Sequence, residues 1–166
     1  MSTQNFNYKE ARDHMAEMVD SIKTGMLITD IGNKPLSAIP MSTNKVDDEG
    51  NIWFLSRLDS DHNSDIVRDG DVQLLYSNPS GMEFISIYGK AAINTKEERL
   101  KELYSKSDDA WFDGLDDPNL TAIKIVPHEA YFWDTKQNKY IGLFKMGLAA
   151  VTGEKQDVGD KGKLNL

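Results

Sequence analysis

The sequence has no cysteine, and its 166 residues include only five prolines and three tryptophans. Without cysteine there are no disulfides, thiolate nucleophiles or zinc ribbons, which fits a reducing compartment. Basic residues are also scarce, since 19 Lys and Arg stand against 27 Asp and Glu and give a formal net charge of -8. This balance argues against nucleic acid as a partner, because a phosphate backbone requires a clustered basic face.

Long apolar runs are absent as well. No segment approaches the roughly 18 apolar residues that a membrane span requires, and the first residues lack the basic and apolar regions of a secretory signal. A chain of this length can bury a core of its own. We therefore predict one domain over residues 1–166, with no membrane partner and a cytoplasmic location.

Short runs of β-branched and aromatic residues dominate the middle of the chain, which predicts a mainly β fold. Polar turn sequences such as VDDEGN, a predicted hairpin tip, separate these runs and are typical of antiparallel connections. We expect a small β-barrel over residues 25–135 with peripheral helices. The predicted strands are residues 26–31, 35–43, 51–57, 71–77, 82–93 and 121–133.

Helical spacing of apolar residues appears at both ends of the chain. It predicts an N-terminal helix at residues 7–22 and a C-terminal helix at residues 139–152. Two further helices are expected, a brief one within residues 58–70 and one at residues 96–106. The polar residues 153–166 are predicted to form a mobile tail.

The residues usually responsible for catalysis form no recognisable motif. His14, His62 and His128 have no metal-binding spacing, and no nucleophile elbow or phosphate loop occurs. His14 is predicted to lie on the surface of its helix. The segment AWFDGLDDPN lacks the ligand pattern of a calcium loop and is predicted to be a structural turn. We assign no metal site and no catalytic residue.

Two segments suggest a binding role. In LSRLDSDH, Ser60 and His62 stand at a predicted helix start, where an anion can dock, although simple capping of the helix is the alternative. In PHEAYFWD, three aromatic residues follow one another on a predicted strand. Successive side chains on a strand point to opposite faces, so at least one of the three faces something other than the interior.

Three blocks together resemble one known family. PLSAIPMSTNKVDDEGNIWFLSRLDSDH, VQLLYSNPSGMEFISIYGKAAI and AWFDGLDDPNLTAIKIVPHEAYFWD are similar in order and spacing to the general stress protein 26 group of the pyridoxamine 5'-phosphate oxidase-like, FMN-binding split barrels. The resemblance covers roughly residues 15–153. It implies a six-stranded antiparallel split β-barrel and a homodimer that binds two FMN molecules in clefts at the subunit interface.

The resemblance also implies which residues contact the cofactor. Residues of the second predicted strand would lie along the flavin ring, and Leu55 and Ser56 match a pair at the end of the next strand. Ser60 and His62 match the residues that hold the FMN phosphate. Trp133 matches a tryptophan that reaches the flavin of the neighbouring subunit. The residues along the ring are Met41, Ser42, Thr43, Asn44 and Lys45.

Departures from the family pattern limit these implications. Relatives usually carry arginine where this chain has Ile39 and lysine where it has His62, so two cationic contacts to phosphate are missing. Lys34, Lys45 and Arg57 are candidates to replace them. The arginine-histidine substrate motif of true oxidases is absent, so we do not expect oxidation of vitamin B6.

The resulting hypothesis is an FMN-dependent oxidoreductase that acts on an unknown small molecule, with a link to stress taken from the family name. Two alternatives stay open. One is a flavin carrier or sensor without turnover, and the other is a split-barrel dimer whose flavin site has decayed. In the second case Trp133 is an aromatic residue of the dimer core, since tryptophan is enriched at interfaces.

Overall fold

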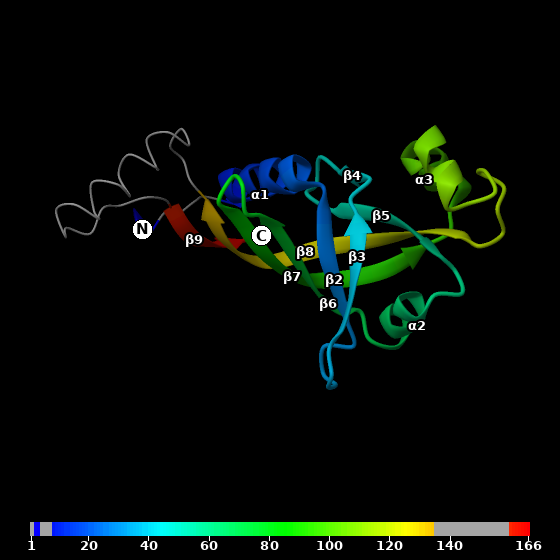
Figure 1. Cartoon of the computed structure of the whole chain (residues 1–166), viewed down its shortest axis with the longest axis horizontal. Coiled ribbons are helices and arrows are strands. Elements are labelled where there is room, and N and C mark those ends of the chain that lie inside the picture. The colour runs from blue at the N-terminus through cyan, green and yellow to red at the C-terminus, as the bar shows by residue number, and fades with distance from the viewer. Residues whose placement is uncertain (1, 4–7, 135–159) are drawn as a thin grey trace.

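A computed structural model describes residues 2–3, 8–134 and 160–166 (Figure 1). The helices are α1 (Tyr8–Ile22), α2 (Asp61–Arg68) and α3 (Glu97–Leu103), followed by the 3-10 segment η1 (Lys106–Ala110). The strands are β1 (Ser2–Thr3), β2 (Thr24–Thr29), β3 (Ser37–Ser42), β4 (Lys45–Val46), β5 (Ile52–Arg57), β6 (Asp71–Asn78), β7 (Glu83–Asn94), β8 (Leu120–Asp134) and β9 (Asp160–Asn165).

The strands form one curled sheet. Its hydrogen-bonded order is β1-β9-β8-β7-β6-β2-β3, and β5 joins it by pairing with both β8 and β4. β4 pairs with β5, and only residues 43–44 separate β4 from β3, the strand at the edge of the sheet. The two ends of the strand order are therefore brought together, and the sheet curls into a barrel. The six predicted strands correspond to β2, β3, β5, β6, β7 and β8, so the prediction of a mainly β, antiparallel split barrel with peripheral helices is confirmed. The short strands β1, β4 and β9 were not predicted.

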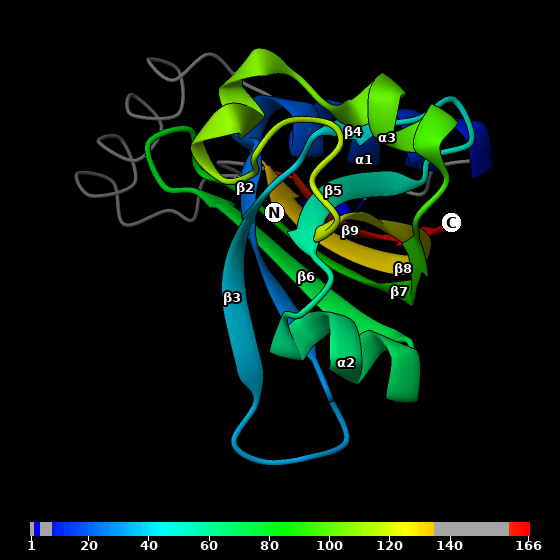
Figure 2. The ribbon, with the colours of Figure 1, turned by 90° about the vertical axis from the view of Figure 1, so that its right-hand side faces the viewer.

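Strand β5 divides two hydrophobic cores. Ile52 and Phe54 are fully buried in the main core inside the barrel, whereas Trp53 lies in a second core beneath α3. This follows from the alternation of side chains along a strand. Figure 2 looks onto the end of the molecule that carries α2 and α3, with β5 between them. Both faces of β5 are therefore covered by packed side chains. This packing holds β5 in place beside the candidate site.

Helix α1 packs its apolar stripe into the main core, as predicted for residues 7–22. His14 was predicted to be on the surface, and this was wrong. Its side chain is only 14% exposed, its Nε2 lies 3.2 Å from Asp134 Oδ2, and its ring meets the edge of Phe132 at 4.7 Å. The helix therefore reaches the far end of β8 with a polar residue as well as with apolar ones.

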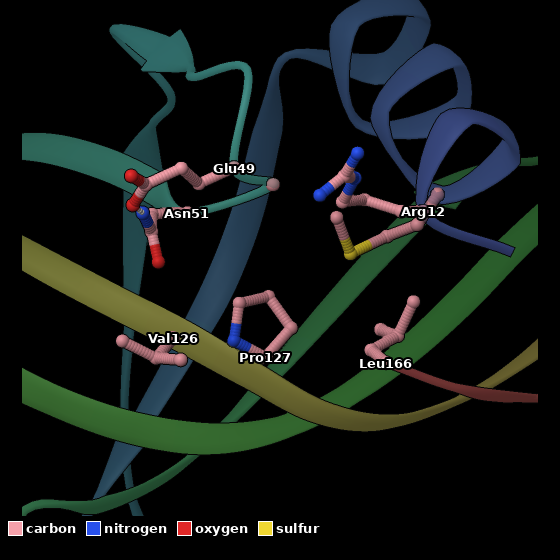
Figure 3. A pocket seen from close by; sticks show the side chains of 8 residues that line it. Arg12, Glu49, Asn51, Val126, Pro127 and Leu166 are labelled. Atoms are coloured by element: carbon pink, nitrogen blue, oxygen red, sulfur yellow. Dashed lines mark hydrogen bonds between the residues drawn. The ribbon is translucent and has the colours of Figure 1, made fainter. Parts of the chain in front are cut away.

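A pocket of about 40 Å³ lies beneath α1 (Figure 3). It holds one or two water molecules at most, so it is too small for a substrate. The residues labelled around it come from α1, the hairpin tip between β4 and β5, β8 and the C-terminus, and they are Arg12, Glu49, Asn51, Val126, Pro127 and Leu166.

A β-bulge in β8 decides how its aromatic residues face. Gly89 pairs with Pro127 and Tyr88 with Glu129, so His128 is an extra residue in the β7-β8 ladder. A bulge of this kind shifts the alternation by one residue. Accordingly Phe132 is buried in the main core, whereas its neighbours in the sequence, Tyr131 and Trp133, are 45% and 39% exposed.

The C-terminal residues differ from the prediction of a mobile tail over residues 153–166. Residues 160–165 form β9, which pairs antiparallel with the last part of β8. Backbone hydrogen bonds suffice for such pairing, so the polar sequence gave no apolar pattern to detect. The predicted helix at residues 139–152 lies outside the described residues. None of the described helices is long and apolar enough to cross a membrane.

Candidate functional site

A cleft of about 630 Å³ opens between β3, β5 and the chain around η1. This volume falls within the range of about 300–1,000 Å³ that is typical of small-molecule sites. Seven of the predicted cofactor-binding residues line it, namely Met41, Ser42, Thr43, Asn44, Leu55, Ser56 and His62. The structure therefore brings together most of a site that the sequence spreads over three segments.

The first wall is the chain from β3 into β4. The Thr43 hydroxyl lies 2.8 Å from the Tyr76 hydroxyl in a buried contact, and Asn44 accepts a hydrogen bond from the Leu55 backbone N–H through Oδ1 at 2.9 Å. A side chain at Gly25 would collide with the ring of Tyr76, since a Cβ there would lie 2.8 Å from it. These contacts hold the edge of the cleft rigidly against β2, β5 and β6.

The second wall is the end of β5, where Ser56 belongs to a buried polar network. Ser56 donates to Asn63 Oδ1, the Asn63 amide donates to Thr121 Oγ1, and Thr121 donates to the backbone oxygen of Ser56, each at 2.9 Å. A closed network of buried hydrogen bonds fixes its members in one arrangement. It ties the start of α2 to β5 and β8, so Ser56 positions the cleft in addition to lining it.

Two basic side chains lie at this end of the cleft, the guanidinium of Arg57 and the imidazole of His62. The Arg57 guanidinium forms a two-pronged contact with Asp59, with Nε–Oδ1 and Nη2–Oδ2 distances of 3.0 and 3.2 Å. His62 Nε2 lies 3.0 Å from Ser60 Oγ. Ser60 caps α2 by accepting from the Asn63 backbone N–H. An anion at this end would therefore meet a guanidinium, an imidazole and the N-terminus of a helix.

The hydrogen bonds of Ser60 determine the neutral form of His62. Ser60 donates its one hydroxyl hydrogen to the Arg57 backbone oxygen at 2.7 Å, so His62 Nε2 must be the donor to Ser60 Oγ. Nδ1 is then the atom that takes up a proton. Burial lowers the pKa of His62 below its ordinary value, although Asp61 and Asp65 act in the opposite direction. The imidazole is consequently neutral at pH 7.

The third wall, around η1, was missed by the sequence analysis, which described this segment as a structural turn. It contributes apolar and polar side chains together, and its Trp111 is 77% exposed. A tryptophan in a polar, turn-rich segment with no periodic apolar partners was the available signal. The members of this wall are Leu103, Ser105, Ser107, Asp108, Trp111 and Phe112.

The remaining predicted residues lie elsewhere. Lys45 forms an ion pair with Glu102 of α3 and does not line the cleft. Ser60 contacts the cleft through His62. Trp133 pairs with Phe84 near the end of β8, and roughly 40 Å of strand separates it from Thr121. Within one chain Trp133 therefore does not contact the cleft.

The family model for pyridoxamine 5'-phosphate oxidase-like proteins matches residues 10–157 of this chain. The chain belongs to this family. The match spans all three walls of the cleft, and Ile39 and His62, where the resemblance leads us to expect arginine and lysine, both line the cleft.

Named relatives agree with this family. General stress protein 26 of Bacillus subtilis (strain 168) is 26% identical over 140 residues, which cover 82% of this chain and 98% of the relative. A solved structure assigned as general stress protein 26 from Jannaschia sp. CCS1 has a TM-score of 0.76 at 25% identity and covers 93% of this chain and 98% of its own.

A second similar structure has a descriptive name. The general stress FMN/FAD binding protein from Xanthomonas citri has a TM-score of 0.65 at 24% identity, with 77% of this chain and 90% of its own covered. At this identity the likeness establishes the shared fold.

Proposed function

We propose that the protein is a homodimeric flavoprotein that binds FMN in this cleft and acts as an oxidoreductase on a small molecule. The observation that carries the proposal is the convergence of seven predicted flavin contacts, His62 among them, with Arg57 in one cleft of suitable volume. The name of the Xanthomonas citri relative supports the choice of a flavin. A bound flavin would supply the redox chemistry, and the protein would orient it and exclude water.

The residues at the cationic end fit a phosphate group. A dianionic phosphate needs charged or dipolar partners when it is partly desolvated. Arg57, His62 and the N-terminus of α2 supply them, and Ser60 supports His62. Asp59 already occupies the Arg57 guanidinium, so phosphate must compete with it. FMN retention consequently depends on His62, which carries a full charge only after taking up a proton.

The outer face of the sheet supports the homodimer. Cross-strand pairs align Pro40 with Met26, Met26 with Leu75, Leu75 with Ser86, and Ser86 with Tyr131, and paired residues share a face. We call this row the outer strip. Its members Met26, Leu75 and Tyr131 are 38%, 42% and 45% exposed. Exposed apolar side chains gathered in one row, interrupted only by Ser86, support an interface on this face.

The outer strip is continuous with the cleft. Pro40 belongs to both, because it pairs with Met26 and also lines the cleft. Trp133 lies on the same face as Tyr131, two residues further along β8. The cleft of this chain is formed without its own Trp133. A second chain packed on the outer strip would bring its Trp133 toward that cleft. The dimer and the flavin site are therefore one proposal.

The direct test is the colour of the purified protein and its mass by sedimentation. We expect a flavin absorbance spectrum, one FMN per chain by mass spectrometry of the extracted cofactor, and a dimer at micromolar concentration. NADH or NADPH should bleach the spectrum, whereas a carrier without turnover would keep it. A colourless chain that does not bind added FMN would instead support the decayed site, which the replacements at Ile39 and His62 favour.

FMN affinity should rise as the pH falls, because the phosphate raises the pKa of a His62 imidazole that burial has lowered. At a pH above the raised pKa of His62 in the FMN complex, His62 is neutral in both the free and the bound protein. It then contributes nothing to the pH dependence of FMN affinity. Between the His62 pKa of the complex and the lower His62 pKa of the free protein, FMN binding is coupled to uptake of a proton. In this range FMN affinity increases by up to about tenfold for each pH unit of acidification. The increase ends near pH 6, where the phosphate itself gains a proton.

This prediction can be checked by titrating FMN into apoprotein between pH 6 and pH 9. His62→Lys should bind more tightly with a flatter profile, since lysine stays charged across this range. His62→Ala should also give a flatter profile but bind more weakly at low pH. Three identical profiles would exclude His62 from the phosphate site and leave Arg57 as its cation.

A further inference from the structure

The cleft has a second end whose chemistry is opposite to that of Arg57 and His62. It is formed by Ser105, Ser107, Asp108 and Trp111, around η1. Trp111 is 77% exposed, whereas the other two tryptophans are 2% and 39% exposed. Nothing in the main core or the second core requires an indole at this position.

The backbone that carries the exposed indole is held in place. The Trp111 backbone N–H donates to the Asp108 oxygen at 2.9 Å, and the next residue, Phe112, is buried in the second core. Ser105 and Asp108 form a capping box that fixes the 3-10 turn before it. An exposed aromatic side chain on a constrained backbone at the rim of a cleft is suited to stacking on a planar ring.

The polar groups beside it accept hydrogen bonds. Ser105 donates its hydroxyl hydrogen to Asp108 Oδ2 at 2.8 Å, so in the 2.7 Å contact between the two serines Ser107 must donate to Ser105. This leaves lone pairs on Ser107 Oγ and on Asp108 Oδ1, which has no hydrogen-bond partner within the described part of the chain. The Asp108 carboxylate also repels anions.

We infer that Trp111, Ser107 and Asp108 form a subsite for a planar aromatic ring that carries hydrogen-bond donors and no negative charge. The inference rests on the proposed function in one respect, because the flavin phosphate is assigned to the Arg57 end and this end is left to the molecule that reacts with the flavin. The subsite thus defines the chemical class of that molecule.

Nicotinamide and nicotinate provide matched probes, because they share a pyridine ring. Nicotinamide carries an amide that donates hydrogen bonds, whereas nicotinate carries a carboxylate in its place. Ligand-observed NMR titration of the purified protein should give a dissociation constant for nicotinamide at least about tenfold below that for nicotinate, since a carboxylate would face Asp108. Trp111→Ala should weaken nicotinamide binding about tenfold, and Trp111→Phe should retain most of it.

Asp108→Asn should reduce the preference for nicotinamide, and Asp109→Asn is the matched control. Asp109 is the adjacent acid, but it accepts a hydrogen bond from the Tyr104 hydroxyl and does not line the cleft. Equal binding of the two probes, or an effect of Asp109→Asn as large as that of Asp108→Asn, would overturn the subsite.

FMN titrations of the same variants separate this inference from the proposed function. We expect Trp111→Ala to bind FMN as the wild type does. A tenfold loss of FMN affinity with unchanged nicotinamide binding would show that Trp111 stacks on the flavin, and would overturn the inference. Failure of the wild type to bind FMN would refute the proposed function, while the preference between the two probes is measured independently of it.

Discussion

Leu75→Arg should convert the proposed dimer into a monomer and release the proposed flavin in the same step. Leu75 is in the middle of the outer strip on β6 and is 42% exposed in the single chain. A surface substitution of this kind changes the stability of the isolated chain by no more than about 0.5 kcal/mol. In a dimer, however, it buries an unpaired charge, and the dimer dissociation constant should rise by at least about 100-fold.

Sedimentation velocity at micromolar concentration and absorbance of the bound flavin measure the two effects on one sample. Val67→Arg is the matched control, because Val67 on α2 is 77% exposed and outside the outer strip, and this variant should stay dimeric and yellow. A Leu75→Arg dimer would exclude the outer strip as the interface. A monomer that retains FMN would show that one chain completes the site alone.

Gly89→Ala should strongly lower the stability of the fold, although it adds only one methyl group. A Cβ at Gly89 would lie 2.4 Å from the Val126 backbone oxygen and 3.1 Å from Pro127 Cα, directly beside the bulge. Backbone atoms of paired strands cannot move away without breaking the ladder. We expect the free energy of unfolding to fall by about 2–4 kcal/mol, which corresponds to a decrease in Tm of roughly 5–15 °C.

Thermal and urea unfolding of the variant provide the measurement. Gly32→Ala is the control, because a Cβ there meets nothing within 4 Å, and its stability should remain within about 0.5 kcal/mol of the wild type. Equal stability of the two variants would mean that the β7-β8 ladder adjusts at the bulge, and that His128 does not fix the orientation of Tyr131 and Trp133.

The strands could be predicted because their side chains alternate, and β5 illustrates the reason. Its apolar residues on both faces are buried in two different cores, so a short apolar run sufficed to identify it. The orientation of the aromatic residues in β8 could not be predicted, since one extra residue reverses it and the sequence does not mark His128 as extra. The sequence predicted only that they would divide between two faces.

For the site, the resemblance supplied what local pattern could not. The residues from Met41 to Asn44 carry no chemical motif, and their role depends on which strand lies beside them. The misplacement of His14 was avoidable, because it is three residues after Ala11 and four before Met18, both buried. That spacing places it on the apolar side of the helix.

The network of Ser56, Asn63 and Thr121 has a consequence for synthesis of the protein. Thr121 follows Ser56 by 65 residues in the chain. At about 5–20 residues per second, a ribosome needs roughly 3–13 s to add that length. During this interval the strands of the first and second walls have been synthesised without β8, against which β5 pairs. A nascent chain without β8 therefore lacks the completed second wall, and the flavin of the proposed function would have to enter a polypeptide whose barrel has already been completed.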